Sequence, residues 1–126
     1  MIPKFRAWWI QDEVMTHIDT LEFLQGGIRV SDGCWHEKFL GDEVILMQST
    51  GLKDKNGIEI FEGDFLTDGE ERWIVRYSET ECGFTASGVG KSGCWSLYHL
   101  ANGKKKGRLI EVIGNKYENP ELLKFR

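Results

Sequence analysis

Short apolar runs separated by glycine-marked turns are the feature that most constrains what this chain can fold into. The sequence has 15 glycines and only 2 prolines. The pairs Asn56-Gly57, Asp68-Gly69 and Asn102-Gly103 each stand beside such a run. Glycine reaches the positive φ values that tight hairpins need, and the apolar residues rarely keep helical spacing. The pattern therefore predicts a mainly β protein built from short strands and tight turns.

The expected strands are runs of apolar residues bounded by turn residues. They cover residues 5–10, 14–18, 28–30, 44–47, 58–61, 65–66 and 73–77, with two more at Phe84 and within 95–100, and a last one at 108–113. Within 73–77, alternation places Trp73, Val75 and Tyr77 together on one face, which we expect to be buried. The glycine-rich stretch 83–93 is interpreted as a mobile hairpin loop.

A short helical turn is expected near the end of the chain. Asn119 suits the N-cap position, Pro120 the first helical position and Glu121 the positive end of the helix dipole. For the whole chain we expect one domain, residues 1–126, because domains of this length are common. Within it, residues 46–126 form a small, partly open β-barrel and residues 1–45 form an N-terminal β extension. Closing a sheet into a barrel also removes exposed edges.

Composition narrows the function classes. The chain has 126 residues, of which 40% are hydrophobic and 29% charged, which is typical of a globular protein. Its net charge of -4 lacks the basic footprint of most nucleic-acid binders. The odd number of cysteines, three, and the lack of a signal-like or membrane-spanning apolar stretch favour the cytoplasm of the cell, with free thiols.

Three sequence blocks carry a resemblance to a known family. They are Lys4-Phe5-Arg6-Ala7-Trp8, the long block from Leu46 to Asp64 (LMQSTGLKDKNGIEIFEGD), and the block from Ile110 to Leu123 (IEVIGNKYENPELL). In this order and spacing the chain resembles the YopX family, small proteins encoded by bacteriophages and prophages. The resemblance implies an SH3-like β-barrel, homo-oligomers and a bacterial host cell, and it carries over no catalytic residue. Ser49 and Lys116 depart from the aromatic and aliphatic residues usual in the family.

Two turns inside the long block have physical interpretations of their own. Asn56-Gly57 predicts a type I′ hairpin turn. Gly63-Asp64 predicts a tight bend at a barrel corner, where the Asp64 carboxylate accepts a backbone N–H bond across the turn. These four residues are therefore expected to serve the fold and not a ligand.

Histidine and cysteine offer the candidates for metal binding or thiol catalysis. Cys34 and His36 would share a strand face, and Cys82, Cys94 and His99 could add ligands. Zinc sites normally use close pairs such as C-x-x-C, which this chain lacks. Free thiols that behave as small hydrophobic groups are the plainer interpretation. The predicted site therefore contains no metal, no cofactor and no catalytic residue, and whether these side chains meet in space stays open.

Carboxylates are concentrated in the long block, at Glu59, Glu62, Asp64 and Asp54. Paired carboxylates can bind Mg²⁺ or perform acid–base catalysis. A solvated turn with charges beside a strand is the simpler interpretation.

The remaining candidates are surface residues that could contact a partner. Trp8 and Trp9 are adjacent, so on a strand they point to opposite faces. Either one of them lies at an interface or the strand is covered on both faces. Basic and aromatic residues could bind single-stranded nucleic acid. The residues proposed for these contacts are Trp8, Trp9, Arg76, Lys104, Lys105, Lys106 and Arg108.

Three functions follow as hypotheses. The first is a non-catalytic, self-associating binding module, a phage or prophage accessory protein with a host or phage protein as partner and no membrane contact. The second is a single-stranded nucleic-acid-binding β-barrel, which is the alternative from a different class. The third is a metal- or thiol-dependent enzyme.

Overall fold

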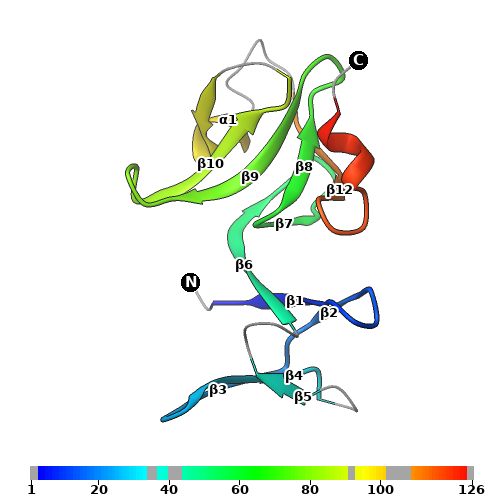
Figure 1. The fold of residues 1–126 in the computed structure, drawn as a ribbon. Coiled ribbons are helices and arrows are strands. Elements are labelled where there is room, and N and C mark those ends of the chain that lie inside the picture. The colour runs from blue at the N-terminus through cyan, green and yellow to red at the C-terminus, as the bar shows by residue number, and fades with distance from the viewer. Residues whose placement is uncertain (1–2, 34–36, 40–43, 91–92, 102–108, 125–126) are drawn as a thin grey trace. The chain divides into compact units, whose positions relative to one another are not determined.

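The computed structural model describes residues 3–33, 37–39, 44–90, 93–101 and 109–124 (Figure 1). Twelve strands lie in these ranges, with one short α-helix, α1 (Leu97–Ala101), and one 3-10 turn, η1 (Pro120–Leu123). The prediction of a mainly β chain with a barrel-like sheet and a short C-terminal helical turn is confirmed. The chain divides into two compact units, residues 1–48 and 49–126.

Unit 1 contains two small sheets. In the first, β1 (Phe5–Trp9) pairs antiparallel with β2 (Val14–His17) on one side and with the first half of β6 (Val44–Lys53) on the other. The second sheet has the order β3-β4-β5, from β3 (Thr20–Leu24), β4 (Gly27–Ser31) and β5 (Glu37–Phe39). The strand β3 was not predicted from the sequence.

The core of unit 1 is an apolar cluster of residues from both of its sheets. Its buried members are Ala7, Trp9, Val30 and Val44, and partly buried aliphatic residues pack around them. The Trp9 indole N–H donates a hydrogen bond to Thr16 Oγ1 on β2, which satisfies its polar group inside the cluster. This cluster fixes which face of each strand points inward.

Unit 2 is a curled half-barrel. Its five-stranded sheet has the order β11-β10-β9-β8-β12 and every neighbour pair is antiparallel. The strands are β8 (Asp64–Thr67), β9 (Arg72–Ser78), β10 (Gly83–Gly88), β11 (Cys94–Ser96) and β12 (Glu111–Asn115). The second half of β6 pairs with β7 (Glu59–Phe61), and Figure 1 shows β8, β9 and β10 curving together.

Both faces of this sheet are covered at its centre. Leu66, Trp73 and Val75 belong to one cluster, while Phe65 and Ile74 belong to another on the opposite side. The predicted face of Trp73, Val75 and Tyr77 is therefore only partly right, since Ile74 is also buried and Tyr77 is 50% exposed. The first half of β9 lies between two clusters, whereas its second half extends beyond them.

The turn chemistry of the long sequence block differs in part from the prediction. Gly57 has φ +80, but Asn56 is not among the residues with positive φ, so a type I′ turn is wrong. Instead, Gly57 N donates to Asp54 O (3.0 Å) and Asp54 N donates to Ile58 O (2.8 Å), which closes a three-residue loop ending in a left-handed glycine. Gly63 has φ +86, and Phe61 N donates to Asp64 Oδ2 (2.8 Å) across that bend.

The C-terminal segment forms a turn of the 3-10 type. Asn119 occupies the N-cap position and Pro120 follows, but the Asn119 side chain makes no cap hydrogen bond. Its Oδ1 instead accepts a hydrogen bond from Asn115 N (3.2 Å). The predicted capping role of Asn119 is therefore wrong, because its side chain is used to hold the preceding turn.

Candidate binding groove

An open groove of about 560 Å³ lies on unit 2. It is bordered by β10, β11, the start of α1, the turn between β9 and β10, and the second half of β6. Its lining residues are Thr50, Leu52, Glu81, Cys82, Gly83, Phe84, Thr85, Cys94, Trp95, Ser96, Leu97 and Tyr98. A groove of this volume is within the range that small ligands or short peptide segments occupy.

Register and helix spacing place the aromatic residues of the groove. Trp95 lies opposite Ala86 in the pairing of β10 with β11, and all three residues of β11 are exposed. The chain then enters α1, where Leu97 and Leu100 are buried three positions apart and anchor the helix to the core. Because Tyr98 falls between these two anchors, its side chain is directed outward and is 62% exposed.

The aromatic character of the groove continues onto β9. The Phe84 ring packs edge-on against the Tyr77 ring, with 5.3 Å between the centroids and 79° between the planes. Phe84 is partly buried against the core, while Trp95 is 44% exposed. The groove thus presents aromatic surface held in place by the fold, without burying it fully.

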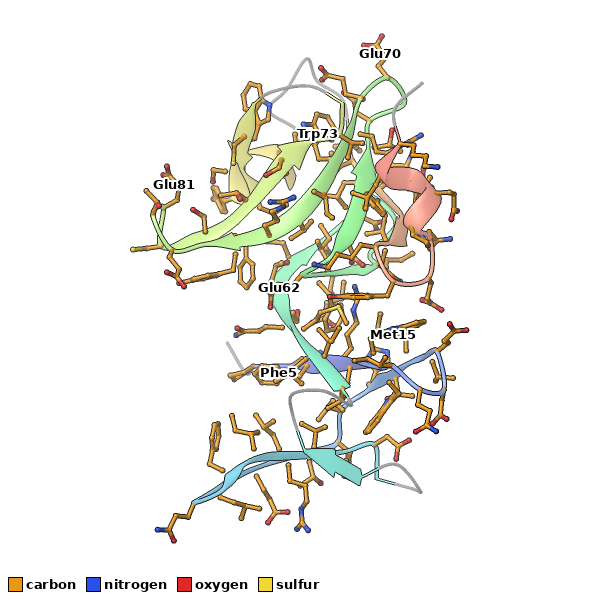
Figure 2. The ribbon with its side chains drawn as sticks, in the orientation of Figure 1. Phe5, Met15, Glu62, Glu70, Trp73 and Glu81 are labelled. Carbon is orange, nitrogen blue, oxygen red and sulfur yellow. The ribbon has the colours of Figure 1, made fainter. Side chains whose placement is uncertain are left out.

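Two polar side chains of the groove are bonded to the backbone of the fold. Thr50 Oγ1 donates to Ile60 O (2.7 Å), and the Cys82 thiol contacts Glu79 O (3.5 Å). Cys82 and Cys94 are both exposed thiols. Glu81 is the one charged side chain among the lining residues that the structure describes, and Figure 2 shows it at the tip of the hairpin joining β9 and β10.

The predicted surface residues are not brought together. Trp9 is 2% exposed and belongs to the core of unit 1, so it offers no surface. Trp8 is half-buried on the same strand, and Arg76 is exposed on β9. The basic residues Lys104, Lys105, Lys106 and Arg108 lie outside the described residues.

The candidate metal and thiol residues are placed only in part. Cys34 and His36 fall outside the described ranges, and nothing is described of the His99 side chain. Cys82 and Cys94 both line the groove, and Ser87 Oγ lies 4.0 Å from Cys94 Sγ. Within the part of the chain that the structure covers, no group of three or more His, Cys, Asp or Glu side chains is arranged to hold a metal ion.

Two of the carboxylates expected to be solvated are buried. Asp54 Oδ1 accepts hydrogen bonds from the backbone N–H groups of Asn56 and Ile58, and its Oδ2 accepts one from Val112, each at 2.9 Å. Asp64 is also buried, with the turn contact described above. The solvated-turn interpretation is wrong for these two residues, because each carboxylate replaces water with backbone donors. For Asp64, the bond from Phe61 N confirms the predicted backbone bond across the bend. Glu59 is half-buried and accepts a hydrogen bond from the Ser49 hydroxyl.

The sequence patterns did not predict the groove. The predicted strand at Phe84 is present, but the interpretation of 83–93 as a mobile hairpin loop is wrong for residues 83–88, which form β10 and pair with strands on both sides. Residues 95–100 were predicted as a strand, but the chain turns into α1 at Leu97. The apolar pair Leu97 and Leu100, spaced as on a helix, was the signal that could have located this change.

Comparisons with known proteins agree with this description. The family model described as YopX protein matches residues 4–124. The crystal structure of protein EF1440 from Enterococcus faecalis resembles this chain with a TM-score of 0.66 and 27% sequence identity, covering 98% of this chain and 99% of that chain. A search of curated proteins gave no significant match. No helix in the described ranges has the length and apolar character needed to cross a membrane.

Proposed function

The chain belongs to the YopX family, and from this premise we propose that it is a phage or prophage accessory protein that works in the bacterial cytoplasm as a non-catalytic, self-associating binding module. The proposal has two parts, self-association and binding of a further partner. One observation supports the first part, and the groove on unit 2 supports the second.

The observation that carries self-association is the hairpin of β3 and β4. Phe23 lies opposite Ile28, two residues from the Leu21–Val30 pair, so alternation places it on the face that enters the core of unit 1. Yet Phe23 is 76% exposed. The core-facing side of the hairpin therefore continues beyond the core as uncovered apolar surface, which is typical of a surface that another molecule covers.

The strand β3 also forms an edge of its sheet. In the order β3-β4-β5, β3 has a neighbour on one side only among the strands that the structure describes. Protected edges commonly carry lysine, proline or an inward-pointing charge. β3 has neither lysine nor proline, and its Glu22 is bound by Arg29 Nε (2.9 Å) across the hairpin. A second copy can pair its own β3 antiparallel with this edge, which gives a two-fold symmetric contact.

Light scattering after size-exclusion chromatography tests this contact, from about 10 µM to about 1 mM protein. We expect the natural chain to show a mass above that of one chain. Phe23→Glu should give a monomer, because it places a charge in the proposed contact, while Gln25→Glu in the neighbouring turn should leave the mass unchanged. A natural chain that stays monomeric over the whole range would remove self-association from the proposal.

Single-stranded nucleic-acid binding remains the second candidate, favoured by the exposed rings of Tyr77, Trp95 and Tyr98, since exposed rings can stack on bases. It predicts salt-sensitive binding of a labelled oligonucleotide that weakens when Lys104, Lys105 and Lys106 are replaced by alanine. No shift of any oligonucleotide at low salt would eliminate this candidate.

A further inference from the structure

We propose that the groove on unit 2 binds an extended segment of another protein that carries a lysine or arginine side chain beside apolar ones. The proposal concerns unit 2 and is independent of the contact through β3. It rests on the chemistry of the lining, in which three aromatic residues and one carboxylate are the groups that can select a ligand.

Charge complementarity favours a cationic side chain. Glu81 supplies the charge of the described lining, and Tyr98, Trp95 and Phe84 supply aromatic rings. Ring faces and a carboxylate attract the same kind of group, a cation that can also contact apolar surface. Lysine and arginine meet both requirements, because their side chains combine a charged end with an apolar stem.

The shape of the border favours an extended chain. β11 is the outer strand of its sheet in the described chain, and its three residues all line the groove. Trp95 lies opposite Ala86 on β10, whereas Glu81 lies in the turn before β10, so the aromatic and acidic groups lie at different places along the groove. An extended segment beside β11 could therefore contact both kinds of group with different side chains. The backbone of β11 offers such a segment hydrogen-bonding groups along the way.

The same lining disfavours a phosphate-rich ligand. A nucleic acid brings phosphate groups to every nucleotide, and Glu81 repels them. The aromatic rings alone could also stack on nucleic-acid bases. The Glu81 carboxylate is therefore the group that favours a cationic peptide over a nucleic acid. A peptide with glutamate in place of lysine is therefore the informative comparison.

Fluorescence anisotropy tests the proposal with three labelled hexapeptides in which valine alternates with lysine, glutamine or glutamate. We expect the lysine peptide to bind about tenfold more tightly than the glutamate peptide. Glu81→Gln should remove most of this preference, and Trp95→Ala should weaken binding of all three peptides. The matched control is Glu79→Gln, which changes an exposed glutamate in the same turn that does not line the groove and should leave the affinities unchanged.

A footprint on the two thiols provides a second measurement. Cys82 and Cys94 line the groove and are exposed, so the bound lysine peptide should slow their alkylation by iodoacetamide. A Cys34→Ser background removes the third thiol from the readout. Equal binding of the lysine and glutamate peptides, equal effects of Glu79→Gln and Glu81→Gln, or thiol protection by an oligonucleotide and not by the peptide would each overturn the proposal. Phe23→Glu should leave peptide binding intact, so the two proposals can fail separately.

Discussion

At the scale of single residues, Asp54 joins parts of unit 2 that lie far apart in the sequence. It is 7% exposed and binds two N–H groups of its own loop and one from β12. Burial raises the pKa of Asp54, but the N–H groups of Val112, Ile58 and Asn56 and the charge of Lys55 outweigh it and lower the pKa below 3.8. The ionised carboxylate is therefore the form that holds the loop and β12 together.

Asp54→Asn should lower the free energy of unfolding at neutral pH by about 1–3 kcal/mol, because backbone donors lose a charged acceptor. Since folding lowers the pKa, the contribution of ionised Asp54 is present above the ordinary value of 3.8 and is lost as pH falls through the folded-state pKa. Urea unfolding at neutral and acidic pH should thus show a smaller pH dependence in the variant. Asp68→Asn is the control, because the backbone bonds that Asp68 accepts among the described residues come from the nearby Glu70 and Glu71. Equal losses in both variants would contradict a special role for Asp54.

Two features of the structure favour glycine at position 114: its backbone conformation and the lack of space for a Cβ atom. It has φ +155, and a Cβ there would lie 2.5 Å from Asn119 Oδ1. That oxygen is held by Asn115 N, and Asn115 Oδ1 in turn accepts bonds from the N–H groups of Tyr117 (3.0 Å) and Glu118 (2.8 Å). Moving the Asn119 side chain aside would therefore break its hydrogen bond with Asn115 N.

Gly114→Ala should lower the free energy of unfolding by more than about 2 kcal/mol, which a thermal melt would detect. Gly69→Ala provides the comparison, because Gly69 also has positive φ, +100, but nothing lies within 4 Å of the added Cβ. The difference between the two variants measures the clash with Asn119 apart from backbone strain. Similar losses of unfolding free energy in the two variants would show that Asn119 moves away from the added Cβ without destabilising the protein.

At the scale of elements, the strands that could be predicted from sequence are those with a run of apolar residues between turn signals. β9 was found because residues 73–75 are apolar in succession, which is also the mark of a strand covered on both faces. β3 was missed because its alternation of Thr20 and Glu22 with Leu21 and Phe23 covers only four residues and ends at Leu24. α1 was missed because it is only five residues long, so the spacing of Leu97 and Leu100 is the one helical signal it offers, and its formation depends on the burial of these two residues.

The C-terminal 3-10 turn is held to the sheet by Arg72. Its Nη1 donates to Leu122 O (2.9 Å) and to Lys124 O (3.3 Å), and the Leu122 side chain packs on the cluster of Phe65, Ile74 and Val89. Charged donors are well suited to this task, since they bind carbonyl groups more strongly than neutral ones do.

Arg72→Met should keep the apolar stem of the side chain and remove both hydrogen bonds. We expect faster amide hydrogen exchange in residues 120–124 and a loss of about 1–2 kcal/mol in the free energy of unfolding. Arg76→Met is the matched control on the same strand, where the side chain is exposed. Unchanged exchange in the C-terminal segment of Arg72→Met would contradict the role of this contact.

At the scale of the whole molecule, each unit has its own apolar cluster. The cluster of unit 1 includes Trp9 and Val30, whereas the two clusters of unit 2 are built around Trp73 and Phe65. Because hydrophobic burial is the main favourable contribution to folding, separate clusters predict separate stabilities.

Val30→Ala, a cavity in the cluster of unit 1, tests this expectation. Hydrogen exchange measured by mass spectrometry should become faster in residues 5–48, in keeping with a loss of about 1–3 kcal/mol, and stay unchanged in residues 59–90. Val75→Ala should give the reverse pattern. A uniform increase over the whole chain in either variant would show that the units unfold as one.

The groove could not be predicted from sequence because it depends on the tertiary structure of unit 2. Its lining comes from residues between Thr50 and Tyr98 that only the curling of the sheet brings together. None of the residues predicted to contact a partner lines the groove. Residues only two positions apart, such as Trp95 and Leu97, differ in burial, one being exposed and the other buried, and the sequence pattern does not distinguish them. The buried carboxylate of Asp54 was missed for a related reason, since its partner Val112 is 58 positions away.

The strand β6 changes its pairing partner along its length. Residues Val44–Gln48 pair with β1, and residues Ser49–Lys53 pair with β7. The pairing with β7 is irregular between Ser49 and Lys53, where Gly51 has φ +81. One extra residue before Gln48 would turn the inward side chains of that half outward, because side chains alternate from face to face. The same insertion beside Gly51 would enter pairing that already contains unmatched residues. We therefore expect natural length variation within this strand to accumulate at Gly51, so that either half can evolve without disturbing the other.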